Sequence, residues 1–175
     1  MDLSLFIVVL GGRSKKSNVE LHDVRWVVGE SIEDTFGELR RQWFGQEEGL
    51  HIDSYKCIKY IDGYKIIISK ASKDKSVNIY SEDKYLWFIN LGGYDENSMN
   101  EHHKFTLVVA NNAREAKRKA KSIWQLDLKK KHNDDCSEIR NIKQIDNLHS
   151  IKKIKGWEIK LVPDQKQRSE KLVPD

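Results

Sequence analysis

The sequence predicts an α+β protein made of two tandem repeats, each with the order strand, strand, helix, strand, strand. Clusters of residues recur at an offset of 81, as from Leu5 to Leu86, which is typical of an internal duplication. Within each copy, short apolar runs rich in β-branched residues flank a segment with helical spacing. We expect one helix packed on a mixed sheet in each repeat, a roll-like or β-grasp-like arrangement, and a pseudo-twofold relation between the repeats.

Thirteen identities support the duplication, and they gather at the predicted strand ends. They are Leu5, Leu10, Gly11, Gly12, Ser17, Glu20, His22, Val27, Val28, Trp43, His51, Asp53 and Ile58, which recur as Leu86, Leu91, Gly92, Gly93, Ser98, Glu101, His103, Val108, Val109, Trp124, His132, Asp134 and Ile139. Because Trp and His are rare residue types, their recurrence carries more weight than that of Leu or Val.

The first predicted repeat covers residues 1–69. Leu3 to Leu10 is an apolar run that stops at two glycines, so it reads as a strand buried on both faces. The segment 20–28 follows a short loop and is its expected antiparallel partner. Ser31 and Asp34 form a capping-box pattern that predicts a helix ending before Gly45. Asp62-Gly63 predicts a hairpin between strands at 52–61 and 64–69.

The second predicted repeat covers residues 84–163 and follows a polar, lysine-rich connector at 70–83. Its last strand begins at Trp157 after Gly156 and matches the segment after Gly63 at an offset of 93 rather than 81. We therefore expect about 12 additional residues, placed near 141–152. The charged, apolar-poor tail at 164–175 is expected to be mobile.

Composition excludes several classes of protein. With 38% hydrophobic and 33% charged residues among 175, the chain has the make-up of a soluble globular protein. No apolar run reaches the roughly 20 residues that a membrane span needs, so we expect a cytoplasmic protein with no membrane partner. Cys57 and Cys136 are not at equivalent positions in the copies, so we expect reduced thiols and no cysteine metal site.

Several longer motifs resemble one known family. They are Leu10-Gly11-Gly12, the run from Asn18 to Arg25, the run from Val28 to Asp34, Gln42-Trp43-Phe44-Gly45 and Leu50-His51-Ile52-Asp53. On these residues the chain resembles the bacterial domain-of-unknown-function family numbered 1543, over nearly its whole length. The resemblance implies a bacterial two-copy member and supplies no activity, cofactor or catalytic residue.

The candidate site residues are histidines and carboxylates spaced two apart. Glu20-x-His22 and His51-x-Asp53 recur as Glu101-x-His103 and His132-x-Asp134. On a strand, residues spaced by two point to the same face, where imidazoles and carboxylates can bind a ligand, ligate a metal or move a proton. The competing interpretation is structural, because each ring can also donate to a nearby oxygen and fix a loop.

A second candidate surface is the predicted helix at 112–124. Arg114, Lys117, Arg118 and Lys121 make it basic, which suits a phosphate backbone or, more commonly, a solvated helix face. The glycine-rich loop at 11–16 precedes a strand, so it is interpreted as a turn. No nucleophile, base and orienting group form a recognisable catalytic set.

From these patterns we predict a non-catalytic module built by duplication that binds a small molecule or a protein. It is expected to need no cofactor and to hold no resident metal, and it forms an internal pseudo-dimer whose further assembly stays open. One alternative is a metal- or acid/base-dependent hydrolase that uses the repeated histidine and carboxylate pairs. The other is nucleic-acid binding through the basic helix.

Overall fold

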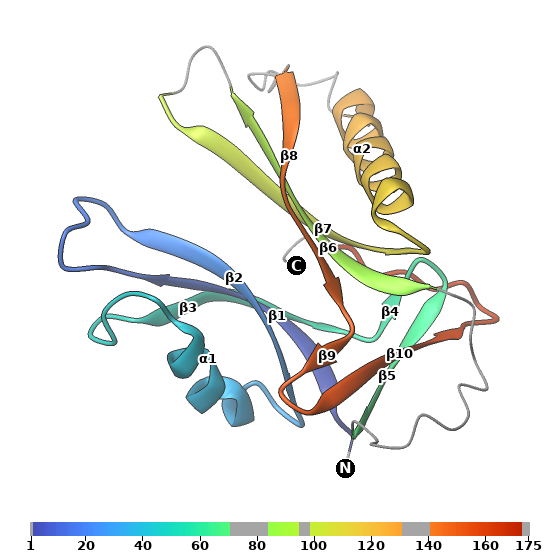
Figure 1. The fold of residues 1–175 in the computed structure, drawn as a ribbon, viewed down its shortest axis with the longest axis horizontal. Helices are drawn as coiled ribbons and strands as arrows, with labels where there is room; N and C mark the ends of the chain where they lie inside the picture. Colours follow the sequence, from blue (N-terminus) through green and yellow to red (C-terminus); the bar gives the residue numbers. More distant parts are fainter. Residues whose placement is uncertain (1, 71–83, 95–98, 131–140, 173–175) are drawn as a thin grey trace. The chain divides into compact units, whose positions relative to one another are not determined.

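The structure is a computed structural model that describes residues 2–70, 84–94, 99–130 and 141–172 (Figure 1). The chain divides into two compact units, Met1–Asp74 with Lys153–Asp175, and Lys75–Lys152. It is an α+β structure, and all strand pairs described are antiparallel. The expectation of mixed sheets was wrong for the described strands, because strands joined by short hairpins and strands paired across longer connections all run antiparallel to their neighbours.

The first unit contains a three-stranded sheet in the order β2(Leu21–Gly29), β1(Ser4–Gly12) and β3(His51–Ile58). β1 is central because its apolar run can be buried on both sides. Phe6, Val8 and Leu10 pack with Leu39 and Trp43 in one buried cluster. This face is therefore covered by the first helix and the segment that follows it.

That helical segment begins with the short turn η1(Glu33–Thr35) and continues as α1(Phe36–Gln42). The backbone N–H of Ser31 donates to Asp34 Oδ2 at 2.9 Å, and the N–H of Asp34 donates to Ser31 Oγ at 3.4 Å. These reciprocal bonds satisfy donors that a helix N-terminus would otherwise leave unpaired. The capping pattern in the sequence thus marks the true start of the helical segment.

The first unit also contains a four-stranded sheet in the order β4(Tyr60–Ile61), β5(Tyr64–Lys70), β10(Trp157–Pro163) and β9(Lys153–Ile154). The β4–β5 turn at Asp62-Gly63 has φ of 49° and 78°, and the β9–β10 turn at Lys155-Gly156 has φ of 42° and 84°. Two successive positive φ values are those of a type I′ hairpin turn. A hairpin from each predicted repeat therefore contributes to one sheet.

The pairing of β5 with β10 is symmetrical about its centre. Tyr64 lies opposite Pro163, Lys70 opposite Trp157, and Ile67 opposite Lys160 in the middle. Since Gly63 corresponds to Gly156 at an offset of 93, each strand meets the other at equivalent positions. This is the register expected for a self-complementary contact between two copies of one strand.

The chain after β10 is bound to the β4–β5 turn. Asp164 N–H donates to the Gly63 carbonyl at 2.8 Å, and Gly63 N–H donates to the Arg168 carbonyl at 3.0 Å. The Arg168 guanidinium lies 3.7 Å from the centre of the Tyr60 ring. Backbone groups between residues 164 and 170 therefore find partners on the hairpin, and the mobility expected of the tail stays a prediction. Residues 173–175 lie outside the described residues.

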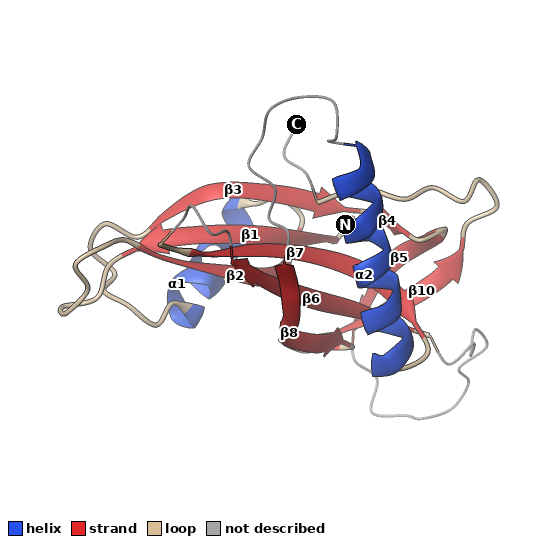
Figure 2. Cartoon of the chain, turned by 90° about the horizontal axis from the view of Figure 1, so that it is seen from above, coloured by secondary structure: helices blue, strands red, loops and turns tan. Residues whose placement is uncertain are grey.

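The second unit contains a three-stranded sheet in the order β7(Glu101–Ala110), β6(Tyr85–Tyr94) and β8(Asn141–Ile151). The helix α2(Ala113–Lys130) packs on β7 and β6 (Figure 2). Its Ala116 and Ala120 are fully buried against Ile89, Leu91 and Val108. Small side chains on this face let the helix lie close to the sheet.

The register of β8 changes the predicted sequence offset between equivalent residues of the two copies. Leu5 lies opposite Ile58 in the first unit, and its equivalent Leu86 lies opposite Ile151 in the second. The offset of 93 therefore already holds at β8, and the additional residues precede this strand instead of falling within 141–152. They lie where α2 is longer than α1 and in the segment 131–140, which is outside the described residues.

Candidate functional site

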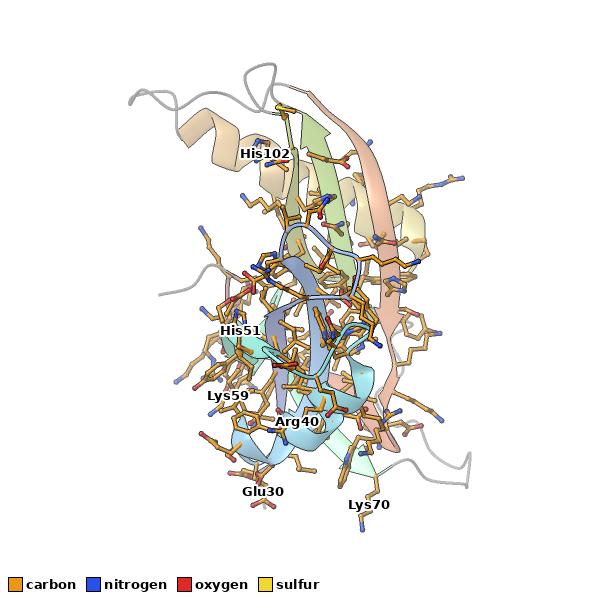
Figure 3. The ribbon with its side chains drawn as sticks, turned by 90° about the vertical axis from the view of Figure 1, so that its left-hand side faces the viewer. Glu30, Arg40, His51, Lys59, Lys70 and His102 are labelled. Atoms are coloured by element: carbon orange, nitrogen blue, oxygen red, sulfur yellow. The ribbon has the colours of Figure 1, made fainter. Side chains whose placement is uncertain are left out.

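The candidate site lies where Gly11, near the end of the central strand β1, is flanked by a histidine on each side. Gly11 pairs with His22 on β2 and with His51 on β3, and directly opposite residues in a sheet share a face. Figure 3 labels His51 on β3. Both imidazoles therefore stand on the same face, with the side-chain-free Gly11 between them.

Gly11 makes the room that this arrangement needs. A Cβ placed on Gly11 would lie 2.7 Å from His51 Nε2 and 3.1 Å from Asp53 Oδ1. A nonbonded contact of 2.7 Å is shorter than van der Waals packing allows. Any other residue at position 11 would displace the imidazole or the carboxylate.

A β-bulge in β3 brings Asp53 beside His51. Val9 pairs with Ser54 while Leu10 pairs with Ile52, so Asp53 is the extra residue that has no partner on β1. Bulges of this kind redirect a side chain relative to a regular strand. Ile52 packs against the core on the face covered by α1, which leaves Asp53 and His51 on the opposite face.

Four side chains converge there in an alternating arrangement. Asp53 bridges the two rings, with Oδ1 at 3.1 Å from His51 Nε2 and Oδ2 at 3.3 Å from His22 Nε2. Glu20 also lies near both rings, but at longer distances. Its Oε1 is 3.5 Å from His51 Nε2 and its Oε2 is 3.9 Å from His22 Nε2. All four side chains are between 33% and 53% exposed, so a ligand in solution can reach them.

The protonation of His51 is coupled to this arrangement. His51 Nδ1 lies 2.9 Å from the Gly49 carbonyl, which can only accept, so Nδ1 carries a proton. The hydrogen bond to Gly49 raises the pKa of His51 above 6.5, and the charges of Glu20 and Asp53 raise it further. When the ring is neutral, its Nε2 is an acceptor that faces two carboxylates.

Only part of this site is repeated in the second unit. His103 Nε2 lies 3.8 Å from Glu101 Oε2, and Gly92 pairs with His103 as Gly11 pairs with His22. On the other side Gly92 pairs with Gln144, so Gln144 holds the position of His51. The same bulge recurs between Ile145 and Asn147, which places Asp146 at the position of Asp53.

The predicted counterparts of His51 and Asp53 were His132 and Asp134, and both lie outside the described residues. Strand register assigns the counterpart positions to Gln144 and Asp146 instead. The signal that could have shown this is the offset of 93 between the two glycine turns, Gly63 and Gly156, continued backwards into the preceding strand. The glycines that shape the site, Gly11 and Gly49, were also missed as site residues.

The other sequence candidates do not join this cluster. Ser17 Oγ donates to the Ser14 carbonyl and accepts from the Ser14 N–H, so it closes its own turn. Cys57 is a free thiol that packs against the buried cluster on the other face of the sheet. Within the described ranges, no group of three or more His, Cys, Asp or Glu side chains is arranged to hold a metal ion.

Comparison with known proteins decides the family. The sequence model described as Domain of Unknown Function (DUF1543) matches residues 17–68 and 98–146, which is more than half of the chain. The chain belongs to the DUF1543 family. This confirms the resemblance found in the sequence, and two separate matches are consistent with a two-copy member. Comparison with curated proteins found no match.

The DUF1543 matches contain the candidate positions of both units. The first includes Glu20, His22, His51 and Asp53, and the second runs from before Glu101 to Asp146. The crystal structure of a protein Il1583 from Idiomarina loihiensis is similar to this DUF1543 chain, with 30% sequence identity and a TM-score of 0.73. That match covers 99% of this chain and 94% of the other. Among the helices described, none combines the length and apolarity required to cross a membrane.

Proposed function

We propose that this chain binds a small ligand with a protonated amine at the cluster of Glu20, His22, His51 and Asp53. Four polar side chains from two strands and a loop meet over a glycine that leaves them room, and this observation carries the proposal. Two carboxylates offer acceptors to an ammonium group, whose three N–H groups need partners. The neutral Nε2 of His51 is a further acceptor, because its Nδ1 proton is engaged by Gly49.

Stability alone explains this cluster poorly. Exposed histidine–carboxylate pairs contribute roughly 0 to 1 kcal/mol, and a glycine inside a strand weakens it. All four side chains remain at least one-third exposed. A set of polar groups that is preorganised at a cost to the strand, yet reached by solvent, suits recognition better than scaffolding.

The neighbouring surface suits a short apolar body on the ligand. Val9 and Val24 pair directly with each other one step along the same sheet face, and both are half-buried. An amine whose carbon chain runs along the strands would remove part of these side chains from water, which is favourable. The ligand class is therefore a small aliphatic amine rather than a free cation.

Binding is favoured over catalysis at this site. Ser17 and Cys57, the candidate nucleophiles of this unit, are engaged in a turn and in the core. Covalent catalysis needs a nucleophile in hydrogen-bond reach of its base. The cluster instead contains groups that accept hydrogen bonds and exchange protons, which is sufficient for holding an amine.

The test is a titration with n-butylamine, n-butanol and butyrate, followed by the NMR signals of the His22 and His51 ring nitrogens. We expect shifts with millimolar n-butylamine and none with the neutral or anionic analogue. Affinity should rise as pH increases through the raised pKa of His51, because the ammonium and the His51 proton compete for the same oxygens. Shifts with butyrate alone, or with Zn²⁺ but not the amine, would contradict an amine site.

Two variants test whether n-butylamine binds at this cluster. Asp53→Asn should weaken n-butylamine binding about tenfold, which corresponds to about 1.4 kcal/mol, because it removes the carboxylate that bridges both rings. Glu48→Gln is the matched control, since Glu48 is exposed on the adjoining loop and has no ion pair or hydrogen bond with the cluster among the described residues. Equal losses in both variants would indicate a general charge effect.

The architecture belongs to the same proposal. We propose that β5 and β10 are equivalent strands of the two copies, related by a local twofold axis through the centre of their pair. The symmetrical register about Ile67 and Lys160 supports this, as do the equivalent type I′ turns. The proposed amine site then belongs to the first copy alone, since the second copy has Gln144 at the position of His51.

A further inference from the structure

The exposed face of α2 is a stripe of four cations. Arg114, Lys117, Arg118 and Lys121 are all exposed, and their spacing of three, four and seven residues places them on one side of a helix. Ala116 and Ala120 are fully buried on the other side. The helix orientation set by the two alanines therefore turns all four cations to solvent.

Among the described residues, these cations have no neutralising partners. None of the four has an ion pair or hydrogen bond through its side chain with another described residue. Nearby, Lys119 pairs with Glu115 at 3.8 Å and donates to the Val109 carbonyl. Elsewhere Arg41 pairs with Glu38 and Arg168 with Asp164. Glu115, the acidic residue in the first turn of α2, pairs with Lys119 on the flank and so does not neutralise the stripe.

We propose that this stripe, Arg114, Lys117, Arg118 and Lys121, binds the phosphate backbone of double-stranded nucleic acid without reading its bases. Phosphate contacts require only correctly placed cations. A helix that lies on a membrane needs an exposed apolar side, and a protein interface usually has an apolar centre. Ile123 is the one large apolar side chain exposed on the described part of α2, and it lies on the side of the buried alanines.

The size of the stripe fits this partner. From Arg114 to Lys121 the helix rises about 10 Å, a length along which duplex DNA carries about six phosphates. If all four cations each neutralise one phosphate, the logarithm of the affinity falls with the logarithm of salt concentration with a slope of about −3.6. Between 50 and 200 mM salt, affinity should then drop on the order of 100-fold.

The experiment measures binding of the full chain to a 20-base-pair DNA duplex by fluorescence anisotropy at several salt concentrations. The test variant carries Arg114→Gln, Lys117→Gln, Arg118→Gln and Lys121→Gln, because glutamine keeps helix propensity while removing charge. We expect at least a 30-fold loss of affinity at 50 mM salt and a slope about three units shallower. A duplex RNA of the same length shows whether one backbone form is preferred, and similar behaviour of both supports backbone binding.

The matched control removes the same charge elsewhere, with Lys15→Gln, Lys16→Gln, Lys160→Gln and Lys166→Gln, all at exposed positions. It should retain nearly all of the affinity. An equal loss in the control, or no duplex binding at 50 mM salt, would overturn the proposal. Equally tight binding to poly-glutamate or to phosphatidylserine vesicles would also overturn it, by showing an acidic protein or a membrane as the partner. If the fourfold variant does not fold, the double variant Arg114→Gln and Arg118→Gln tests the same dependence of affinity on salt concentration.

Discussion

Gly11 determines the candidate site by lacking a side chain. It sits between His22 and His51 in the ladder, and the space where its Cβ would stand is occupied by the His51 ring. The arrangement of the polar side chains in the cluster therefore depends on a residue that has no side chain. Substitutions at this position test the site without removing any of its polar groups.

Gly11→Ala should displace the His51 ring and so separate it from Asp53 and from the Gly49 carbonyl. Because the hydrogen bond to Gly49 and the two carboxylates raise the pKa of His51, the pKa should fall back towards 6.5 in the variant. Unfolding free energy should change by no more than about 1 kcal/mol, since alanine itself suits a strand better than glycine. An NMR titration of the His51 ring and chemical denaturation measure the two effects.

Gly37→Ala is the matched control for that substitution. Gly37 lies in α1, and a Cβ placed there would have no neighbour within 4 Å. The variant should be more stable by about 0.5 to 1 kcal/mol, because glycine inside a helix is unfavourable. The pKa of His51 should stay unchanged, and a fall equal to that in Gly11→Ala would show that the first effect is not local.

The raised pKa of His51 predicts how stability depends on pH. A group whose folded pKa lies above its unfolded value stabilises the folded state below the unfolded pKa, and this contribution is lost as pH rises through the folded pKa. His51→Gln should therefore lower the melting temperature most below pH 6.5, with the difference fading as pH rises through the raised pKa of His51. Melting curves of both proteins across this range provide the measurement. A difference that grows with pH would mean that the ring is held neutral.

At the scale of elements, α1 is joined to the β9–β10 turn by one carboxylate. Glu38 is only 10% exposed and lies 2.7 Å from Lys155 Nζ, and it also accepts hydrogen bonds from Arg41 and Gln42. Lys155 belongs to a turn that comes from the second predicted repeat. This contact holds the helix of one copy to the hairpin of the other within the first unit.

Glu38 predicts a loss of stability in acid. The hydrogen bond from Arg41, with contributions from Gln42 and Lys155, lowers the pKa of Glu38 from 4.5 to about 2. A depressed folded pKa stabilises above the unfolded pKa, and the stabilisation is lost as pH falls from 4.5 towards 2. Glu38→Gln should thus cost about 1 to 2 kcal/mol at neutral pH after screening of its exposed partners.

The measurement is urea denaturation of the wild-type chain and Glu38→Gln at several values of pH. The difference in unfolding free energy should shrink steadily as the wild-type carboxylate is protonated. Glu33→Gln serves as the control, because Glu33 is exposed at the start of the same helical segment. A constant difference down to about pH 2 would mean that the charge of Glu38 is not what stabilises this contact.

At the scale of the whole molecule, the β4–β5–β10–β9 sheet combines strands from both predicted repeats, which lie far apart in the sequence. β5 pairs with β10 along its full length, and the segment after β10 closes over the β4–β5 turn. Without β10, β5 would be an edge strand with unpaired backbone groups. Such edges tend to pair with another chain.

The symmetrical register predicts what an isolated first copy would do. A fragment of residues 1–70 keeps β5 and loses β10, so two fragments should pair through β5 with Ile67 opposite Ile67. Sedimentation equilibrium should show a dimer whose population depends on concentration. The full chain is the control, because its β10 already covers this edge. A folded fragment that stays monomeric at high concentration would show that the β5 edge is not self-complementary.

The sequence by itself determined the family, the α+β class and the elements whose signals are local. Two such signals are the capping pattern at Ser31 and Asp34 and the glycine turns at Gly63 and Gly156. Both depend on the backbone preferences of a few neighbouring residues, so they can be predicted from the sequence. The grouping of Glu20, His22, His51 and Asp53 was also foreseeable in part, because residues spaced by two share a strand face.

Only the tertiary structure decided which residues meet. Strand register placed Gln144 and Asp146, rather than His132 and Asp134, at the positions of His51 and Asp53, because additional residues between β7 and β8 shift the numbering without changing the strand pairing. The tertiary structure also pairs β5 with β10 and hydrogen-bonds the tail to the turn at Gly63. These pairings bring together segments far apart in the chain, and hydrogen-bond partners at that separation are selected by packing and not by local sequence preference.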